Sequence, residues 1–384
     1  MSLPDSSIDD LGYIAPTPLP QREWYQTGRV PAKSRIMDYG YIVEEGPVGC
    51  TAQELIEAVV ERRGQISFVW TPGTPEPVRP EQVPFLLGAL SDAKARDARN
   101  WFTVGASAVI LGLMSAFVAE DWVRLNRSIF LAVGAFCLAM GNTKYWRSRT
   151  YTQENAISDA SAARFETWVQ KKSISAYTIA VIAASVLATM VAGWAADSTA
   201  LAGLVKPAVW GGEVWRLFTA PLIHASFTHL MFSAVGLIYF SKITEQTIHR
   251  ALVPLLFLVS AVIGSASSLL FDPLTTSMGG ASGGLMGLVG FVTTAAFLDR
   301  IYYPVDYFKR MLVIITTIFA VNIFGFEFFD PTAGFGGLVT GGILGWLGVK
   351  AQSQIGGKLV KLVGAGGVLA LVSTAVFAVS RLVS

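Results

Sequence analysis

The residues of this 384-residue chain that could do chemistry are one serine set among glycines and a few histidines. Ser282 stands in the run Gly279-Gly280-Ala281-Ser282-Gly283-Gly284, at the start of an apolar segment. A serine exposed in a glycine cradle at a helix N-terminus could act as a nucleophile while nearby amides hold an oxyanion. The three histidines are His224, His229 and His249. These residue types suggest acyl-transfer chemistry of the serine-hydrolase kind.

The same residues also have a structural interpretation. Gly283-x-x-x-Gly287 is a small-x-x-x-small pattern that is typical of helix packing. The Ser282 hydroxyl could bond back to the backbone of its own helix. A single histidine such as His229 on an apolar helix is typical of a hydrogen-bonded bundle residue. The motifs need a wider context before they indicate an activity.

The composition places these residues in a membrane protein with a polar N-terminal part. Charged residues make up only 15% of the chain, against roughly 25% in soluble domains. Of the 56 charged residues (29 basic plus 27 acidic), 24 lie in residues 1–100 and 32 in the rest of the chain. This excludes a single soluble domain. A net charge of +2 gives no argument for nucleic acid, and Cys50 and Cys137 match no disulfide framework or zinc spacing.

Beyond residue 100, apolar segments follow one another closely. Each is near the ~20 residues that a helix needs to cross a ~30 Å hydrocarbon core. We place nine of them, at about 101–119, 128–143, 175–195, 228–248, 251–271, 281–298, 311–328, 333–349 and 362–381. The sequence therefore predicts an all-α polytopic membrane protein.

The distribution of Lys and Arg predicts the orientation. Alternate loops hold fourteen of these residues on one side of the membrane and five on the other. Because cytoplasmic loops carry the excess of positive charge, we expect a multi-pass protein of the cell membrane whose N-terminal part is cytoplasmic. The loops 196–227, 272–280 and 329–332 then face outward, which places Ser282 and His229 near the outer face.

The N-terminal part is predicted to contain a flexible tail at 1–37 and a small soluble α+β module at 38–92. We expect a strand at 39–43, a turn at Gly46-Pro47-Val48-Gly49, and a helix that begins at the capping box Thr51-Ala52-Gln53-Glu54. This order resembles the small GYF-like modules appended to bacterial membrane proteins. An unrelated small α+β domain is the alternative.

Other predicted segments flank a central core. Two extra transmembrane helices occupy 101–143, and one more occupies 359–384. The stretch 150–172 carries Phe165 and Trp168 among charged residues, which predicts an amphipathic linker helix on the inner membrane surface.

An ordered set of motifs covers the core, residues 173–350. The set comprises Trp215-Arg216, His224-x-x-x-x-His229, Glu245, Gly280-Ala281-Ser282-Gly283 and Gly337-x-x-x-Gly341. It resembles the rhomboid family of intramembrane serine proteases, which implies a six-helix core. The resemblance implies that Ser282 holds the nucleophile position and that His229 helps to hold the oxyanion. It also implies that Arg216 is held by Glu245.

The chain departs from the family pattern at the catalytic base. The base histidine should stand three residues before Gly337, where this sequence has Gly334, and no histidine follows His249. The asparagine that accompanies the oxyanion histidine is replaced by Ser233, and the aromatic residue that packs on the base is replaced by Met286. The resemblance therefore implies a scaffold that keeps the nucleophile position but lacks the base.

Two functions remain open after these departures. The first is a pseudoprotease that binds transmembrane segments or client membrane proteins without cleaving them. The second is an active intramembrane serine endopeptidase in which His229 or Asp330 serves as an unconventional base. A channel or transporter is disfavoured because membrane-embedded charge is scarce. Glycines between 333 and 345 would admit a client helix, or would only pack on the Ser282 helix.

The expected partners follow from this architecture. They are the lipid bilayer, client transmembrane segments, and a possible cytoplasmic ligand of the module at 38–92. We expect no nucleic acid, no metal and no cofactor.

Overall fold

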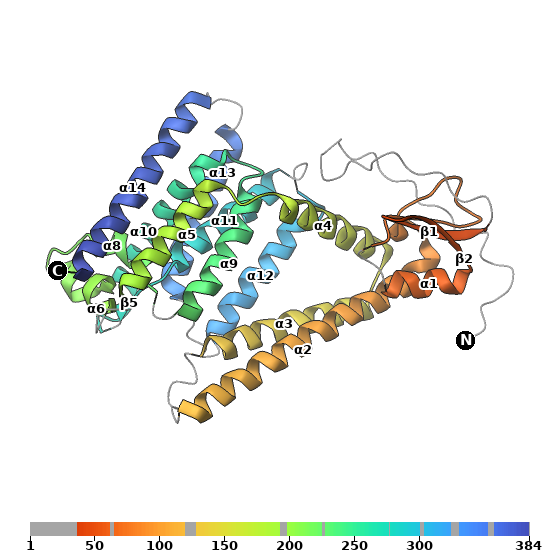
Figure 1. Ribbon diagram of the computed structural model, residues 1–384, viewed down its shortest axis with the longest axis horizontal. Helices are drawn as coiled ribbons and strands as arrows, with labels where there is room; N and C mark the ends of the chain where they lie inside the picture. The colour runs from red at the N-terminus through yellow and green to blue at the C-terminus, as the bar shows by residue number, and fades with distance from the viewer. Residues whose placement is uncertain are drawn as a thin grey trace. The chain divides into compact units, whose positions relative to one another are not determined.

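A computed structural model describes residues 37–61, 65–119, 128–192, 198–224, 227–275, 277–299, 303–323, 330–351 and 357–383 (Figure 1). The chain divides into two compact units. One unit comprises the chain up to Leu111 together with Val133–Glu166, and the other comprises Gly112–Ala132 together with Thr167 onward. Apart from Met37, the predicted tail at 1–37 lies outside the described residues.

The N-terminal unit begins with a three-stranded antiparallel sheet in the order β2-β1-β3. Its strands are β1 (Tyr39–Val43), β2 (Gly46–Cys50) and β3 (Phe68–Trp70), and α1 (Ala52–Glu61) follows β2. Leu55 and Val59 of α1 are fully buried in the same apolar core as the sheet. This arrangement confirms the small α+β module.

The turn expected at Gly46-Pro47-Val48-Gly49 is wrong, because these residues form most of β2. The chain instead turns at residues 44–45. Pro47 pairs with Ile42 on a strand at the edge of the sheet, where the missing proline amide costs no interior hydrogen bond. The capping box is confirmed, since the Thr51 amide donates to the Glu54 carboxylate at 2.7 Å and the Glu54 amide donates to the Thr51 hydroxyl at 3.3 Å.

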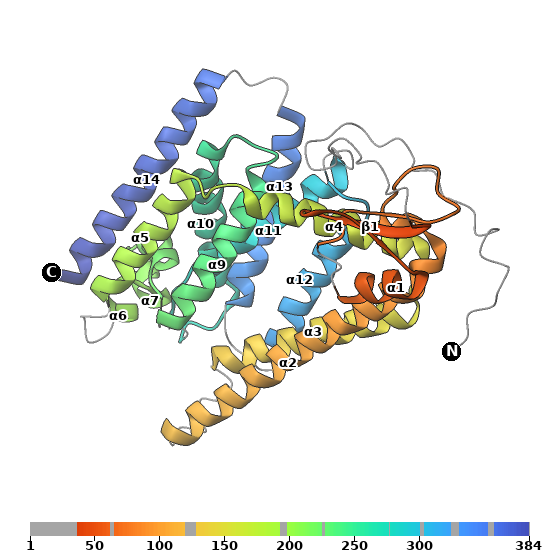
Figure 2. The same ribbon diagram turned by 45° about the vertical axis from the view of Figure 1, so that its right-hand side comes forward.

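Two short 3-10 turns, η2 (Pro80–Gln82) and η3 (Pro84–Leu86), lead into the long helices α2 (Leu87–Ala119) and α3 (Ile129–Arg149). Figure 2 shows α2 and α3 running alongside each other. Each helix has two glycines seven residues apart, and each glycine lies against a large side chain of the other helix. The facing pairs are Gly105 with Leu138, Gly112 with Leu131, Gly134 with Val109, and Gly141 with Phe102.

The predicted linker helix is α4 (Gln153–Lys171). Its apolar side is covered by protein, because Ala156 joins the apolar core of the sheet and Phe165 is only 1% exposed. Buried Asp159 makes ion pairs with Lys94 of α2 at 2.7 Å and with Arg147 of α3 at 3.4 Å. The position of this helix on the membrane surface stays a prediction, and the contacts above show only that one side of α4 packs against protein.

The second unit holds the core helices and the loops between them. The longer helices are α5 (Ala176–Ala192), α9 (Phe227–Thr244), α10 (Val253–Phe271), α11 (Ser282–Leu298), α12 (Tyr307–Ile323), α13 (Pro331–Ala351) and α14 (Gly357–Val383). The short elements are α6 (Ser198–Ala202), β4 (Leu204–Val205), α7 (Lys206–Trp210), α8 (Arg216–Thr219), η5 (Ala220–Leu222), η6 (Arg250–Leu252) and β5 (Ser277–Met278).

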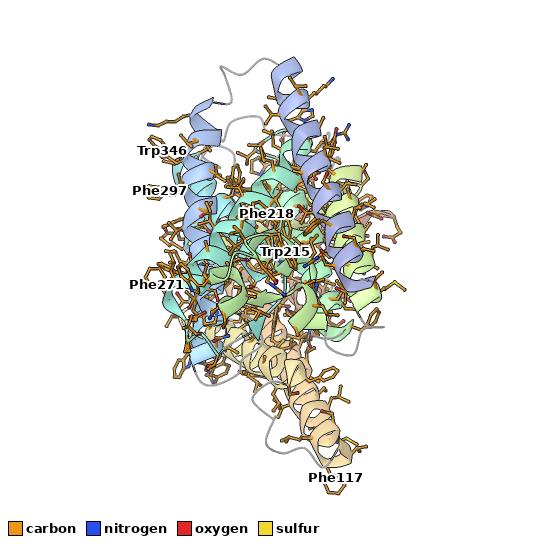
Figure 3. All side chains as sticks on the ribbon, turned by 90° about the vertical axis from the view of Figure 1, so that its left-hand side faces the viewer. Phe117, Trp215, Phe218, Phe271, Phe297 and Trp346 are labelled. Carbon is orange, nitrogen blue, oxygen red and sulfur yellow. The ribbon has the colours of Figure 1, made fainter. Side chains whose placement is uncertain are left out.

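Each of the nine predicted apolar segments contains a helix. Four described helical stretches are individually long and apolar enough to cross a membrane: Pro84–Val118, Arg250–Phe271, Pro331–Lys350 and Val360–Arg381. The α11 helix is a shorter apolar helix. Large apolar side chains such as Phe271, Phe297 and Trp346 lie on the outside of this unit (Figure 3), as expected of a surface in contact with lipid.

Helices α10, α11 and α13 form the centre of the second unit. Their contacts are so close that several glycines leave no room for a side chain. A Cβ atom at Gly337 would lie 1.9 Å from the Gly283 carbonyl oxygen, and one at Gly341 would lie 1.8 Å from the Gly287 carbonyl oxygen. Of the two uses that the sequence left open for the α13 glycines, packing on the Ser282 helix is the one observed.

The extra C-terminal helix α14 packs along α5 and α10, and the three lie side by side in Figures 1 and 2. It also contacts the loop that carries Trp215. The Trp215 ring packs edge-on against Phe377 of α14 at 5.4 Å, and the guanidinium groups of Arg216 and Arg381 lie 4.7 and 5.1 Å from its centroid. The α14 helix therefore covers one flank of the core.

Candidate active site

The Ser282 segment is held in place by the loops around it. Strand β5, which lies in the loop between α10 and α11, pairs with β4, and the Gly280 amide donates to the Ala220 carbonyl at 3.0 Å. Gly280 has φ +134°, a conformation that L side chains rarely adopt. Ser282 follows as the first residue of α11 and is half-buried. Its hydroxyl forms no hydrogen bond with any described residue.

His229 lies beside this loop. A Cβ atom at Gly280 would lie 2.8 Å from Cε1 of His229, so Gly280 is required for space as well as for backbone conformation. This contact brings the imidazole to the residue two positions before Ser282. Ser233, one turn further along α9, is buried. The structure thus brings His229 and Ser282 to one end of the bundle.

His224 is a member of the site to which the sequence assigned no role. It lies in the connection before α9, and its ring centroid is 5.0 Å from that of His229. Thr189 of α5 lies 3.3 Å from Nδ1 of His224 and accepts the His224 backbone amide at 3.2 Å. Burial and the charge of His229 lower the pKa of His224 to about 3, so the ring is neutral at physiological pH.

Gly334 occupies the first turn of α13, close to Ser282. A Cβ atom at Gly283, the residue after Ser282, would lie 3.3 Å from the carbonyl oxygen of Ala333, the residue before Gly334. The two positions that would form a catalytic dyad are therefore neighbours across the α11–α13 contact. Gly334 has no side chain to accept a proton. Met286, one turn after Ser282, is buried on α11.

Asp330, the other candidate base, is used to begin α13. Its Oδ1 accepts the Ala333 amide at 2.8 Å, which is the bond of a helix N-cap. Burial raises the pKa of Asp330, and the hydrogen bond from the Ala333 amide acts against this shift. A carboxyl group with a raised pKa is a better proton acceptor, but this one is already engaged in capping.

A second carboxylate ties Lys206 and the loop that begins at Pro273 to α10 and α13. Asp272 accepts hydrogen bonds from Ser268 at 2.7 Å and from Thr332 at 2.5 Å. Fully buried Lys206 donates to the Pro273 carbonyl at 3.0 Å and lies 3.7 Å from Asp272. These contacts hold the ends of α10 and α13 in fixed positions near Ser282.

Trp215 and Arg216 lie on the loop expected of them, but the predicted pairing of Arg216 with Glu245 is wrong. Arg216 Nε pairs with Glu213 at 2.6 Å, and Nη1 donates to the Ala200 and Gly203 carbonyls at 2.9 and 3.0 Å. Glu245 instead accepts hydrogen bonds from two hydroxyls at the start of α5, Ser175 at 2.5 Å and Thr178 at 3.0 Å.

The physical reason for this difference is distance along a helix. Arg216 lies on the loop that follows the end of α5, whereas Glu245 contacts the start of α5. A helix of 17 residues is about 25 Å long, which no arginine side chain spans. Glu245 therefore binds side chains at the start of α5 rather than holding the loop.

Comparison with known proteins agrees with this geometry. Residues 211–351 match the family model described as Rhomboid domain. The chain is 33% identical over 155 residues to RHOMBOID-like protein 6, mitochondrial, of Arabidopsis thaliana, which covers 39% of this chain and 48% of that protein. It is 33% identical over 138 residues to RHOMBOID-like protein 1 of the same plant, covering 35% and 34%.

A third relative has a name that bears on activity. The chain is 30% identical over 130 residues to Inactive RHOMBOID-like protein 8 of Arabidopsis thaliana, covering 33% of this chain and 36% of that protein. In all three comparisons the chain spans less than half the length of the relative.

Proposed function

Because residues 211–351 match the rhomboid domain family model, we propose that the protein is a pseudoprotease that binds transmembrane segments of client membrane proteins without cleaving them. The observation that carries this proposal is the absence of a base at the Ser282 hydroxyl. Gly334 stands at the base position, and no histidine follows His249 in the sequence. Loss of a general base typically costs ~10²–10⁴-fold in rate.

Exposed apolar surface on α9 and α12 supports the proposed binding of client helices. The glycine contacts hold α13 against α11, the helix that begins at Ser282. Among the described helices, α12 has an extensive contact with α11 alone. Exposed apolar residues, among them Val235 of α9 and Leu312 of α12, leave lipid-facing surface that a client helix could contact. The opposite flank, along α5 and α10, is covered by α14.

A fluorophosphonate probe tests the catalytic half of the proposal. We expect no labelling of the purified wild-type protein at Ser282. Labelling that disappears in Ser282→Ala would overturn the proposal. The double variant Gly334→His with Met286→Tyr supplies the missing base and its aromatic platform, and labelling gained by this variant supports the alignment of the two sites.

Site-specific photo-crosslinking tests the binding half. A photoreactive amino acid is placed at Val235, at Leu312, or at Leu369, which is 68% exposed on α14 and serves as the matched control. We expect adducts with single-span membrane proteins at Val235 and Leu312 that exceed those at Leu369. Equal yields at all three positions would indicate random collision in the bilayer and would contradict client binding.

The second candidate function is an intramembrane serine endopeptidase with an unconventional base. Two observations favour it: the raised pKa of Asp330 and the contact of His229 with the Ser282 loop. Cleavage of a reconstituted transmembrane substrate that is abolished by Ser282→Ala would establish it. Asp330→Asn and His229→Gln would then identify the base.

We also place the N-terminal module in the cytoplasm, at the inner face of the cell membrane, where it could recruit a partner. The excess of Lys and Arg in alternate loops supports this orientation. Protease protection of the module in sealed inside-out and right-side-out vesicles tests it. If the module were digested only in right-side-out vesicles, it would lie outside the cell, and the proposed orientation would be wrong.

A further inference from the structure

The His224 ring holds a buried nitrogen that no contact explains. The residue is 3% exposed, and its Nε2 has no hydrogen-bond partner among the described residues. The other ring nitrogen, Nδ1, is engaged with the Thr189 hydroxyl at 3.3 Å. A buried polar atom without a partner is rare and calls for a ligand, an ion or a water molecule.

The contacts of Thr189 assign the proton on this ring. The Thr189 hydroxyl lies 3.2 Å from the Leu222 carbonyl oxygen, which can only accept a hydrogen bond. Its single proton is therefore donated to Leu222, and its oxygen accepts from the His224 backbone amide and from Nδ1. Nδ1 of His224 then carries the ring proton, and Nε2 carries an unshared electron pair. This is the arrangement that metal-binding histidines adopt, with the second nitrogen donating to a fixed acceptor.

The second imidazole lies at the distance that a shared metal ion requires. Two imidazole nitrogens at about 2.0–2.1 Å from one tetrahedral Zn²⁺ place their ring centroids about 5 Å apart. The centroids of His224 and His229 are 5.0 Å apart. His229 is half-buried, and its position is fixed by its contact with Gly280.

From these observations we propose that His224, through Nε2, and His229 bind a divalent transition-metal ion of the zinc class at the outer end of α9. Neutral imidazoles suit Zn²⁺, Cu²⁺ and Ni²⁺, whereas Mg²⁺ and Ca²⁺ prefer oxygen ligands. The described residues contain no cluster of three or more His, Cys, Asp and Glu side chains. Water therefore completes the coordination in this proposal, and Thr189 is a positioning residue that sets the tautomer of His224.

Metal analysis of the full chain, purified without a polyhistidine tag and stripped with a chelator, tests the site. We expect one equivalent of Zn²⁺ per chain after dialysis, and its loss in His224→Phe and in His229→Phe. The matched control is His249→Gln, because the His249 ring accepts the Ala251 amide at the other end of α9 and takes no part in the pair. Thr189→Val keeps the side-chain shape and should weaken binding at least tenfold.

A measurement on the wild-type protein tests the proposal even if the variants fail to fold. With only three histidines, ¹⁵N-histidine spectra should resolve each ring. Zinc should shift the Nε2 signal of His224 and one ring-nitrogen signal of His229, and should leave the His249 signals unchanged. Before zinc is added, the His224 signals should show a proton on Nδ1. Zinc-insensitive spectra, or a wild-type protein that retains no more zinc than His224→Phe, would overturn the proposal and leave water as the partner of Nε2.

Discussion

The contact between α11 and α13 predicts that a single methyl group at Gly341 will destabilise the core. A Cβ atom at this position would lie 1.8 Å from the Gly287 carbonyl oxygen, and further backbone atoms of the same residue lie at 2.5 and 2.7 Å. Ordinary contact begins near 3.4 Å, so the helices must separate locally by about 1.6 Å (3.4 minus 1.8). The obstructing atoms are backbone, which cannot rotate away.

The expected cost follows from two opposing terms. Overpacking a close-packed core costs about 1–3 kcal/mol, and the upper end applies where backbone must move. Alanine has a helix propensity about 1 kcal/mol better than glycine. The net loss in Gly341→Ala is therefore about 2 kcal/mol, or about 4–8 °C in Tm for a unit of this size.

Thermal unfolding in detergent, followed by tryptophan fluorescence, measures this effect against two matched controls. Gly366→Ala on α14 has no atom within 4 Å of the added methyl group and should unfold at or above the wild-type temperature. At Gly342 the methyl group would meet first the Thr294 hydroxyl at 3.2 Å, and this side chain can turn aside. A Tm for Gly341→Ala equal to that of Gly366→Ala would refute the packing argument.

Three further predictions concern the supports of the site and the N-terminal module. Glu245→Ala leaves the Ser175 and Thr178 hydroxyls without their acceptor and should lower the unfolding free energy by about 1–3 kcal/mol, with a smaller loss in Glu245→Gln as measured by chemical denaturation. Gly280→Ala forces a side chain into a left-handed conformation against His229, so both the Tm and the His229 NMR signals should change. Burial and the nearby Glu54 charge raise the pKa of Cys50 to about 11, so in a Cys137→Ala background its alkylation at pH 8 should be slow and should accelerate as the pH rises towards 11; fast, pH-independent labelling would contradict this.

The helical core could be predicted because a membrane leaves few alternatives. Backbone amides and carbonyls have no water to bind in hydrocarbon, so an apolar run of about 20 residues becomes a helix whatever its neighbours. The α2–α3 pair was also predictable in principle. Gly105, Gly112, Gly134 and Gly141 repeat every seven residues within their segments, and in an antiparallel pair such glycines fall opposite large side chains of the partner helix.

Local sequence patterns gave wrong or incomplete predictions where contacts between residues far apart in the sequence determine the structure. The residues Gly46-Pro47-Val48-Gly49 have turn composition, but pairing with β1 made them an edge strand. The role of Glu245 depended on which end of α5 it would meet, and no spacing in the sequence contains that information. His224 was visible in the sequence, yet its significance depends on Thr189, which is 35 residues away on another helix.

The residues that hold α11 against α13 are different from the residues that would carry out catalysis. The atoms that bring the helices together belong to Gly283, Gly287, Gly337 and Gly341, and none of them transfers a proton. A side chain at position 334 is not needed for this contact. The first turn of α13, which contains Gly334, is held by hydrogen bonds from the Ala333 and Gly334 amides to Asp330. Under the proposed function, a glycine in place of the base histidine would therefore stop the reaction without disturbing the fold.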